Sequence, residues 1–296
     1  MGERLQLNET DPREAEAMRR IWSLIRSAEE LAPVIDEHRH PAVGSAYQAD
    51  TALCEEYPTS SSVHHLLMAA QGNLAGLRRA LAVVETDSSI DMTMDLYGVY
   101  ELVRGSLETG AWALWLMSPQ NPRRRTRRNL VMLREEHKNR VKILQALDRP
   151  AMQVEDYRRQ IMHRLDAYAE RAGIDPWPVK GSAPEDILAD APAQSTRALR
   201  YVSALHEPEE LAVGYWAAWC MASGMAHGQQ WAFHLLHERR ELNETTMDAL
   251  MTGSYVSLHA LVQAASVLIN TAVNRHVALT TQASPGPVLV ALLPRS

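Results

Sequence analysis

The sequence predicts an all-α protein: a multi-helix bundle of about seven to eight helices around a buried, uncharged central helix. The chain has 296 residues, of which 46% are hydrophobic, enough for a sizeable core. Its apolar residues recur at helical spacing, and no segment alternates as a strand would. No Asp, Glu, Lys or Arg occurs from Leu211 to His237. A helix over that span has no charged face for water, so we place it at the centre of the bundle.

The N-terminal segment, residues 1–58, should hold one helix and an irregular connection. The helix is expected to begin at Asp11, with Pro12 in its first turn and Glu14 completing a capping box. It should end near Leu31, before Pro33. Residues 38–58 show no sustained period and read as a connection.

The bundle domain is predicted to span residues 59–279. Helices are expected at about 59–85, 89–117, 122–147 and 152–171, the second stopped by Ser118 and Pro119 and the last by Gly173. Four prolines mark a linker at 174–196, with a short helix at 185–190. Two long helices, at about 208–241 and 245–276, complete the bundle, and residues 280–296 form a flexible tail.

Composition favours a cytoplasmic protein. Cys54 and Cys220 are far apart and match no zinc or disulfide spacing, and the first residues contain no apolar signal core. The uncharged segments 211–237 and 249–274 are each long enough to span a bilayer. Their load of His, Gln, Ser and Asn suits a buried bundle better, so we expect no membrane association.

A run of arginines near the start of one helix is the clearest candidate for binding an anion. Five guanidinium groups fall within six positions, at the end of the helix where the dipole disfavours cations: Arg123, Arg124, Arg125, Arg127 and Arg128. From Arg123 to Arg149 there are ten Lys and Arg against three Asp and Glu. Because the whole chain carries −6, the remainder carries −13. Phosphate or RNA is one reading, and a solvated face paired with acids is the other.

A second candidate site joins two apolar helices. Arg104 and Glu108 stand four positions apart among apolar neighbours, where charges are costly to bury unless they are paired. They can bridge each other along the helix. Alternatively, Arg104 can reach a polar centre formed by Ser223 and His227 on the uncharged helix.

These residues resemble the all-helical HEPN-like proteins. The resemblance rests on Arg104-x-x-x-Glu108 and on Ser223-Gly-x-Ala-His227-Gly, and it covers about residues 61–276. It implies a helical bundle, a homodimer and action on RNA, by binding or by metal-independent cleavage, in stress or defence. Active members place an Arg four to six residues from a His on one helix, whereas no Arg stands within six residues before His227. A catalytic set would therefore comprise Arg104, Glu108, Ser223 and His227, with His as base and Arg on the phosphate, and no cofactor.

Two alternatives come from other functional classes, so whether the protein is an enzyme stays open. One is a metal-dependent bundle enzyme that uses histidines from several helices. Its candidate ligands are His64, His65, His137, His227 and His234. None of these histidines stands in a Glu-x-x-His or His-Glu-x-x-His motif, so no metal site is assigned. The other is a non-enzymatic protein that binds an acidic partner through the arginine run.

Overall fold

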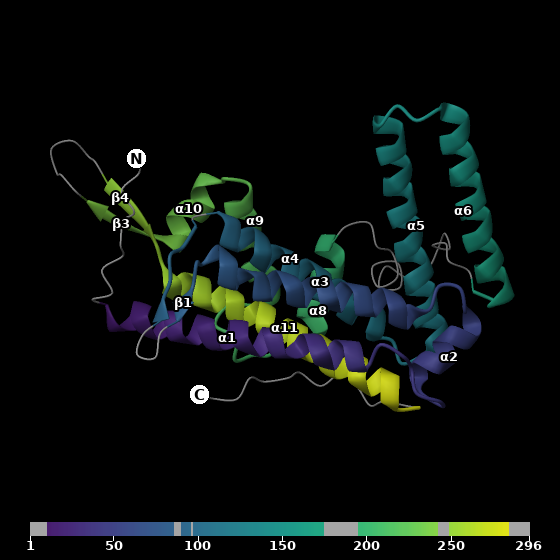
Figure 1. Ribbon diagram of the computed structural model, residues 1–296, viewed down its shortest axis with the longest axis horizontal. Coiled ribbons are helices and arrows are strands. Elements are labelled where there is room, and N and C mark those ends of the chain that lie inside the picture. The colour runs from purple at the N-terminus through teal and green to yellow at the C-terminus, as the bar shows by residue number, and fades with distance from the viewer. Residues whose placement is uncertain (1–10, 86–89, 96, 175–194, 242–248, 284–296) are drawn as a thin grey trace.

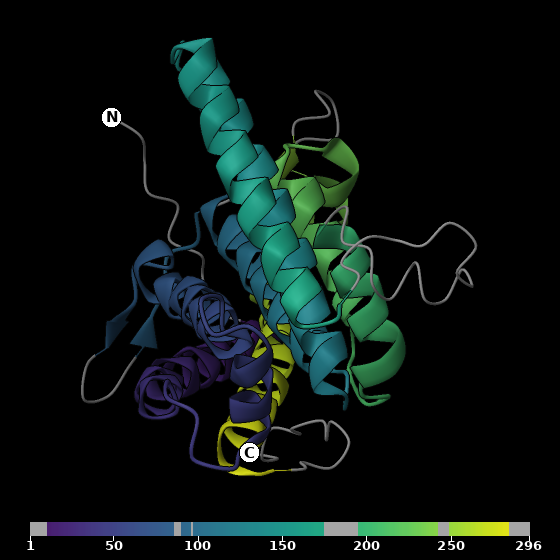
Figure 2. The same ribbon diagram turned by 90° about the vertical axis from the view of Figure 1, so that its right-hand side faces the viewer.

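The computed structural model describes residues 11–85, 90–95, 97–174, 195–241 and 249–283. Within them the all-α prediction is confirmed, with ten helices and two short β-hairpins. The body is elongated, with α1, α3, α4 and α11 along its length, and a hairpin of two helices projects from one end (Figure 1). Viewed along the long axis, the hairpin crosses the end of the bundle, and its far end extends beyond it (Figure 2).

Two of the first three helices, α1 and α3, were predicted, and α2 was not. Helix α1 (Pro12–Glu37) is capped by Asp11, whose side chain accepts from the Arg13 amide. It continues through Pro33 for another turn and buries Ile35, so the predicted end at Leu31 is wrong. Helix α2 (Ala46–Leu53) lies inside the stretch expected to be irregular, and α3 (Thr59–Ala80) ends earlier than expected.

Glu14 does not complete the predicted capping box. Its carboxylate instead accepts hydrogen bonds from the Ser254 hydroxyl at 2.9 Å and the Tyr255 amide at 2.6 Å. These groups stand at the start of α11 (Tyr255–Thr281), so Glu14 caps that helix from across the bundle. Helix α1 thereby joins the same core as the later helices, across the predicted boundary at residue 58.

The core is centred on α4 (Gly98–Met117) and α11. Helix α4 packs against α3, α8, α9 and α11, and twelve of its twenty residues are buried. Seventeen of the 27 residues of α11 are buried. Helix α11 is long and apolar enough to cross a membrane, and 67% of its most apolar window is buried inside the protein. A bundle's core helix has the same length and composition.

The uncharged segment 211–237 does not form one central helix. It is divided into α9 (Tyr215–Ala226) and α10 (Gln230–Leu236), and only five of the twelve residues of α9 are buried. Gly228 separates them, with a φ of +64°. The Gly228 amide donates to the Met225 carbonyl and the Gln229 amide to the Gly224 carbonyl, the two bonds of a Schellman motif. The small residues of this segment therefore serve a turn and a close helix contact.

Two short hairpins flank this part of the bundle. Strand β1 (Val84–Glu85) pairs with β2 (Ile90–Asp91), and β3 (His237–Glu241) pairs with β4 (Ala249–Gly253) in antiparallel register. The predicted helix 208–241 ends in β3, and the predicted helix 245–276 is replaced by β4 followed by α11. The helix of residues 89–117 starts only at Gly98.

The projecting hairpin consists of α5 (Pro122–Ala146) and α6 (Ala151–Arg171), both close to their predicted ranges. Asn121 caps α5 through its side chain, and Gly173 ends α6 as predicted, at a φ of +61°. Helix α8 (Ser195–His206), at a place where no helix was predicted, packs against α4 and α9. The predicted short helix at 185–190 and most of the tail lie outside the described residues.

Candidate functional site

The arginine run at the start of α5 divides between the interior and the surface. Arg125 and Arg128 are each only 1% exposed. Arg123 and Arg124 are exposed, and Arg127 is half-buried. A spacing of three residues returns the side chain to nearly the same helix face, so the two inward arginines share one stripe.

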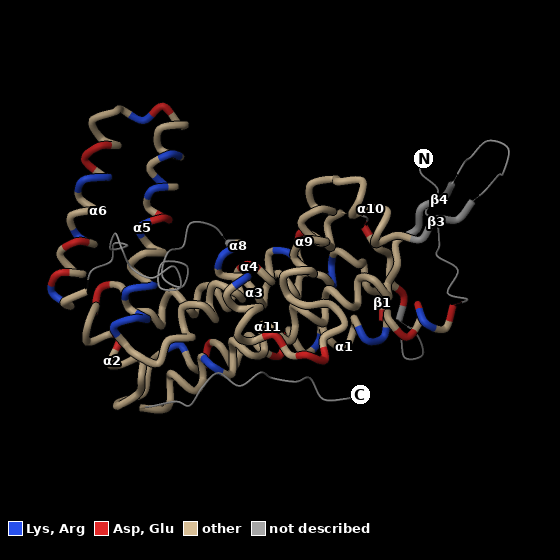
Figure 3. The backbone as a smooth tube through the Cα atoms, turned by 180° about the vertical axis from the view of Figure 1, so that it is seen from behind, with Lys and Arg blue, Asp and Glu red and all other residues tan. Residues whose placement is uncertain are grey.

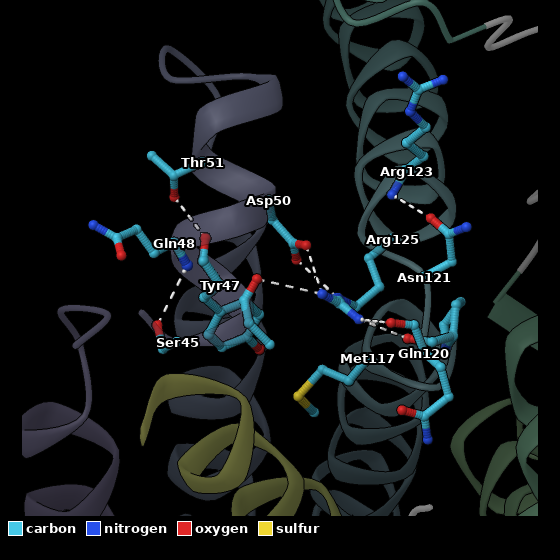
Figure 4. Close-up of polar contacts among 12 residues, drawn as sticks. Ser45, Tyr47, Gln48, Asp50, Thr51, Met117, Gln120, Asn121, Arg123 and Arg125 are labelled. Atoms are coloured by element: carbon cyan, nitrogen blue, oxygen red, sulfur yellow. Dashed lines mark hydrogen bonds and ion pairs between the residues drawn. The ribbon is translucent and has the colours of Figure 1, made fainter. Parts of the chain in front are cut away.

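Arg125 forms a buried ion pair with Asp50 of α2 (Figure 4). Its Nε donates to Oδ2 at 2.8 Å, and one terminal nitrogen donates to Oδ1 at 2.6 Å. The other terminal nitrogen donates to the carbonyls of Pro119 and Gln120, just beyond α4. Burial raises the pKa of Asp50 to about 6, opposed by the hydrogen bonds and charge of Arg125. The carboxylate is thus ionised at neutral pH, and the pair fixes the base of the hairpin to α2 and α4.

Arg128 is held between two aromatic rings. Its guanidinium carbon lies 4.8 Å from the ring centroid of Trp115 in α4 and 4.8 Å from that of Tyr201 in α8. It also donates a hydrogen bond to the Trp115 carbonyl. The side chain therefore ties α5, α4 and α8 together and takes no part in a solvent-facing surface.

The basic charge that remains outside the interior lies on the α5 arm of the hairpin. Without the buried Arg125 and Arg128, residues 122–149 have eight Lys and Arg against three Asp and Glu, a surplus of five, whereas α6 has four of each. Blue segments recur along both arms (Figure 3). The exposed basic side chains of the hairpin are Arg123, Arg124, Lys138, Arg140, Lys142, Arg149, Arg158, Arg159, Arg164 and Arg171.

The second predicted site is assembled in part. Arg104 Nε donates to Glu108 Oε1 at 3.0 Å, the pairing along one helix that the sequence allowed. A second carboxylate, that of Glu101, lies 3.4 Å from the Arg104 guanidinium. The indole Nε1 of Trp219 in α9 donates to the same Glu108 oxygen at 2.8 Å. Arg104 is thus engaged by two carboxylates, and Glu108 reaches the uncharged segment through a tryptophan.

Ser223 and His227 lie farther along α9, on either side of the helix end. Ser223 is half-buried in α9, one turn beyond Trp219. His227 is the C-cap of α9 and is exposed. Among the described contacts, no hydrogen bond joins His227 to Arg104, so the base and the phosphate-binding group of the predicted catalytic set are not brought together.

The histidines proposed as metal ligands are dispersed. His64 Nε2 lies 3.2 Å from Asp36, and His137 Nδ1 lies 2.7 Å from the Tyr157 hydroxyl. His65 and His234 are exposed. Within the described part of the chain, no three His, Cys, Asp or Glu side chains are placed to hold a metal ion.

No protein-family model matches the chain, and no match was found among curated proteins or solved structures. Neither the family resemblance nor an activity therefore has support from a relative.

An aromatic cluster on α8 and α9 was missed at the sequence level. Trp216 and Trp219 stack with their ring centroids 5.1 Å apart and an interplanar angle of 18°. Arg200 of α8 places its guanidinium carbon 4.3 Å from the Trp216 ring centroid. The signal was present in the three-residue spacing of the two tryptophans, which puts them on one helix face.

Proposed function

We propose that the protein binds RNA, with the α5–α6 hairpin as the main contact for the phosphate backbone. The observation that carries this proposal is the separation of charge: the α5 arm of the hairpin keeps a surplus of five positive charges once the buried Arg125 and Arg128 are set aside, and the chain outside residues 122–149 carries −13. A basic element that stands away from an acidic body attracts a polyanion and leaves the body repelled. The expected HEPN-like character agrees with an RNA ligand.

Binding is favoured over cleavage by the surroundings of Arg104. Its guanidinium is already engaged by Glu108 and Glu101, so a phosphate at that place would have to displace carboxylates. The imidazole of His227 lies at the exposed end of α9, with no contact to Arg104 among the described residues. We therefore assign the protein RNA binding and give Arg104 and Glu108 a positioning role, developed below.

The salt dependence of binding tests the hairpin. Each phosphate contact that is lost should reduce the slope of log K against log salt by about 0.7 for single strands and about 0.9 for duplexes. A variant that replaces three exposed basic residues of α5 by glutamine should therefore lower the slope by about 2 and weaken binding at low salt. The three changes are Arg123→Gln, Arg140→Gln and Lys142→Gln. Fluorescence anisotropy of a labelled RNA over a salt series measures both quantities.

A matched control removes the same charge from the body. Arg19, Arg20 and Arg26 of α1 are exposed, with side chains 61%, 52% and 60% accessible. Their joint replacement by glutamine changes the net charge by the same amount and should leave the slope unchanged. Equal slopes for the hairpin variant and the wild-type protein would contradict the proposal, as would a wild-type protein that binds no RNA.

A further inference from the structure

Helices α8 and α9 carry a ladder of stacked planar groups at the protein surface. The order is the Arg200 guanidinium, the Trp216 indole and the Trp219 indole, with separations of 4.3 Å and 5.1 Å. Both indoles are half-buried, and Arg200 is exposed. The guanidinium is a planar cation lying on the outer face of Trp216, the place that a planar ring would take in a stack.

The inner end of the ladder is fixed by hydrogen bonds. Trp219 Nε1 donates to Glu108 Oε1 at 2.8 Å, and Arg104 holds the same oxygen at 3.0 Å. The Trp216 backbone amide donates to the Ser203 hydroxyl at 3.1 Å, which joins α9 to α8. An indole whose ring direction is set in this way loses little freedom when a ring stacks on it. Arg104 and Glu108 thus position Trp219 and need not touch a ligand.

The ladder is linked to the base of the basic hairpin. Tyr201 follows Arg200 in α8 and contacts Arg128 of α5, so α8 lies against the start of the hairpin. Arg197 is exposed one turn before Tyr201. Two exposed arginines, Arg197 and Arg200, thus lie on α8, the helix that contacts the start of the hairpin and carries one end of the ladder. A strand whose phosphates follow the basic side chains would bring its bases to the stacked rings.

We propose that Trp216, Trp219 and Arg200 form a stacking site for the unpaired bases of single-stranded RNA. This inference rests on the proposed RNA binding and specifies its substrate class. An incoming base takes the place of the Arg200 guanidinium on Trp216, and the long side chain of Arg200 turns to a neighbouring phosphate. Stacking tolerates any base, because every base has a π face, whereas a duplex keeps its bases out of reach.

The test uses the full-length protein and three RNAs with the same number of phosphates per strand: a short single strand, the same strand annealed to its complement, and an abasic strand. The single strand should quench tryptophan fluorescence and bind at least about fivefold more tightly than the abasic strand, the lower end of the effect of one stacked base. It should also protect the half-buried thiol of Cys220, which Arg200 is close enough to influence, from alkylation.

Substitutions test whether the preference for single-stranded RNA depends on Trp216 and on the Glu108 contact. Trp216→Leu keeps an apolar side chain and should weaken single-strand binding at least about fivefold, with duplex and abasic affinities unchanged. Glu108→Ala should weaken it and Glu108→Gln should restore it, because the amide oxygen can still accept from Trp219. Trp231→Leu, at an indole 49% exposed on α10, is the control and should change nothing.

The results distinguish a failure of the stacking site from a failure of RNA binding itself. Equal affinity and equal quenching for the base-bearing and abasic strands overturn the stacking site while leaving RNA binding by the hairpin intact. Unchanged single-strand affinity in a folded Trp216→Leu protein does the same. If that variant does not fold, the abasic comparison and the protection of Cys220 in the wild-type protein still decide. A wild-type protein that binds none of the three RNAs refutes the proposed function itself.

Discussion

Loss of the Asp50 carboxylate should leave the hairpin base with an uncompensated buried charge. The paired side chains are 2% exposed for Arg125 and 0% for Asp50. Asp50→Ala removes two charge-assisted hydrogen bonds and leaves the guanidinium with neutral carbonyl acceptors alone. Breaking a buried pair in this way costs about 3 to 5 kcal/mol. At about 2 to 4 °C per kcal/mol for a chain of this size, the midpoint of thermal unfolding should fall by about 6 to 20 °C.

Urea unfolding of a double-mutant cycle measures the cost directly. Arg125→Met removes the charge from the other side and keeps a long apolar stem. The double variant should be no less stable than Asp50→Ala, since no buried charge is then left alone. Arg123→Met, at an exposed position on the same helix turn, should change stability by no more than about 0.5 kcal/mol. A loss below about 1 kcal/mol for Asp50→Ala would show that water reaches the pair and would refute this account of the hairpin base.

Two further predictions concern the bundle. Burial, with smaller effects from His64 and His38, lowers the pKa of His276 to about 4. The unfolded chain therefore takes up this proton at higher pH, and stability present above about pH 6.5 is lost as the pH falls towards 4. When the pH falls from 7.5 to 4.5, the free energy of unfolding should decrease by about 2 to 3 kcal/mol more in the wild-type protein than in His276→Gln. Urea unfolding at the two pH values measures this difference. At Gly224, an added Cβ would stand 2.7 Å from the Ala232 Cβ. Gly224→Ala should therefore lower the free energy of unfolding by about 1 to 3 kcal/mol. An unchanged midpoint of urea unfolding would contradict the close approach of α9 and α10.

Helix boundaries that depend on a neighbouring capping or helix-breaking residue could be predicted from the sequence. Helix α1 begins after Asp11, α5 begins at Pro122, and α6 ends before Gly173, each within a residue or two of expectation. These signals depend on nearby residues only, which is why they can be read from one sequence. The Gly228 turn offered the same kind of signal. The prediction of one long helix over 211–237 rested on the absence of charged residues there and gave no weight to Gly228.

Contacts between residues far apart in the sequence could not be predicted from the residue pattern. Asp50 meets Arg125 across 75 positions, and Glu14 caps α11 across about 240. Neither position has a periodicity or motif that names its partner. The Arg104 and Glu108 pair was predictable because four residues of helix bring the two side chains together, whereas the Trp219 contact that completes it depends on the packing of α9 on α4.

The division of the arginine run also resolves why the run opposes the helix dipole. A cation at a helix start is unfavourable in water, where nothing else holds it. Arg125 and Arg128 are not held by the helix: Asp50, the carbonyls after α4 and two aromatic rings bind them, and these contacts exceed a dipole effect of about 0.3 to 1 kcal/mol. Their burial orients α5, which carries Arg123 and Arg124 outward on its remaining face. The inward arginines thus fix the direction in which the hairpin presents its charge, and only the outward ones are available to a polyanion.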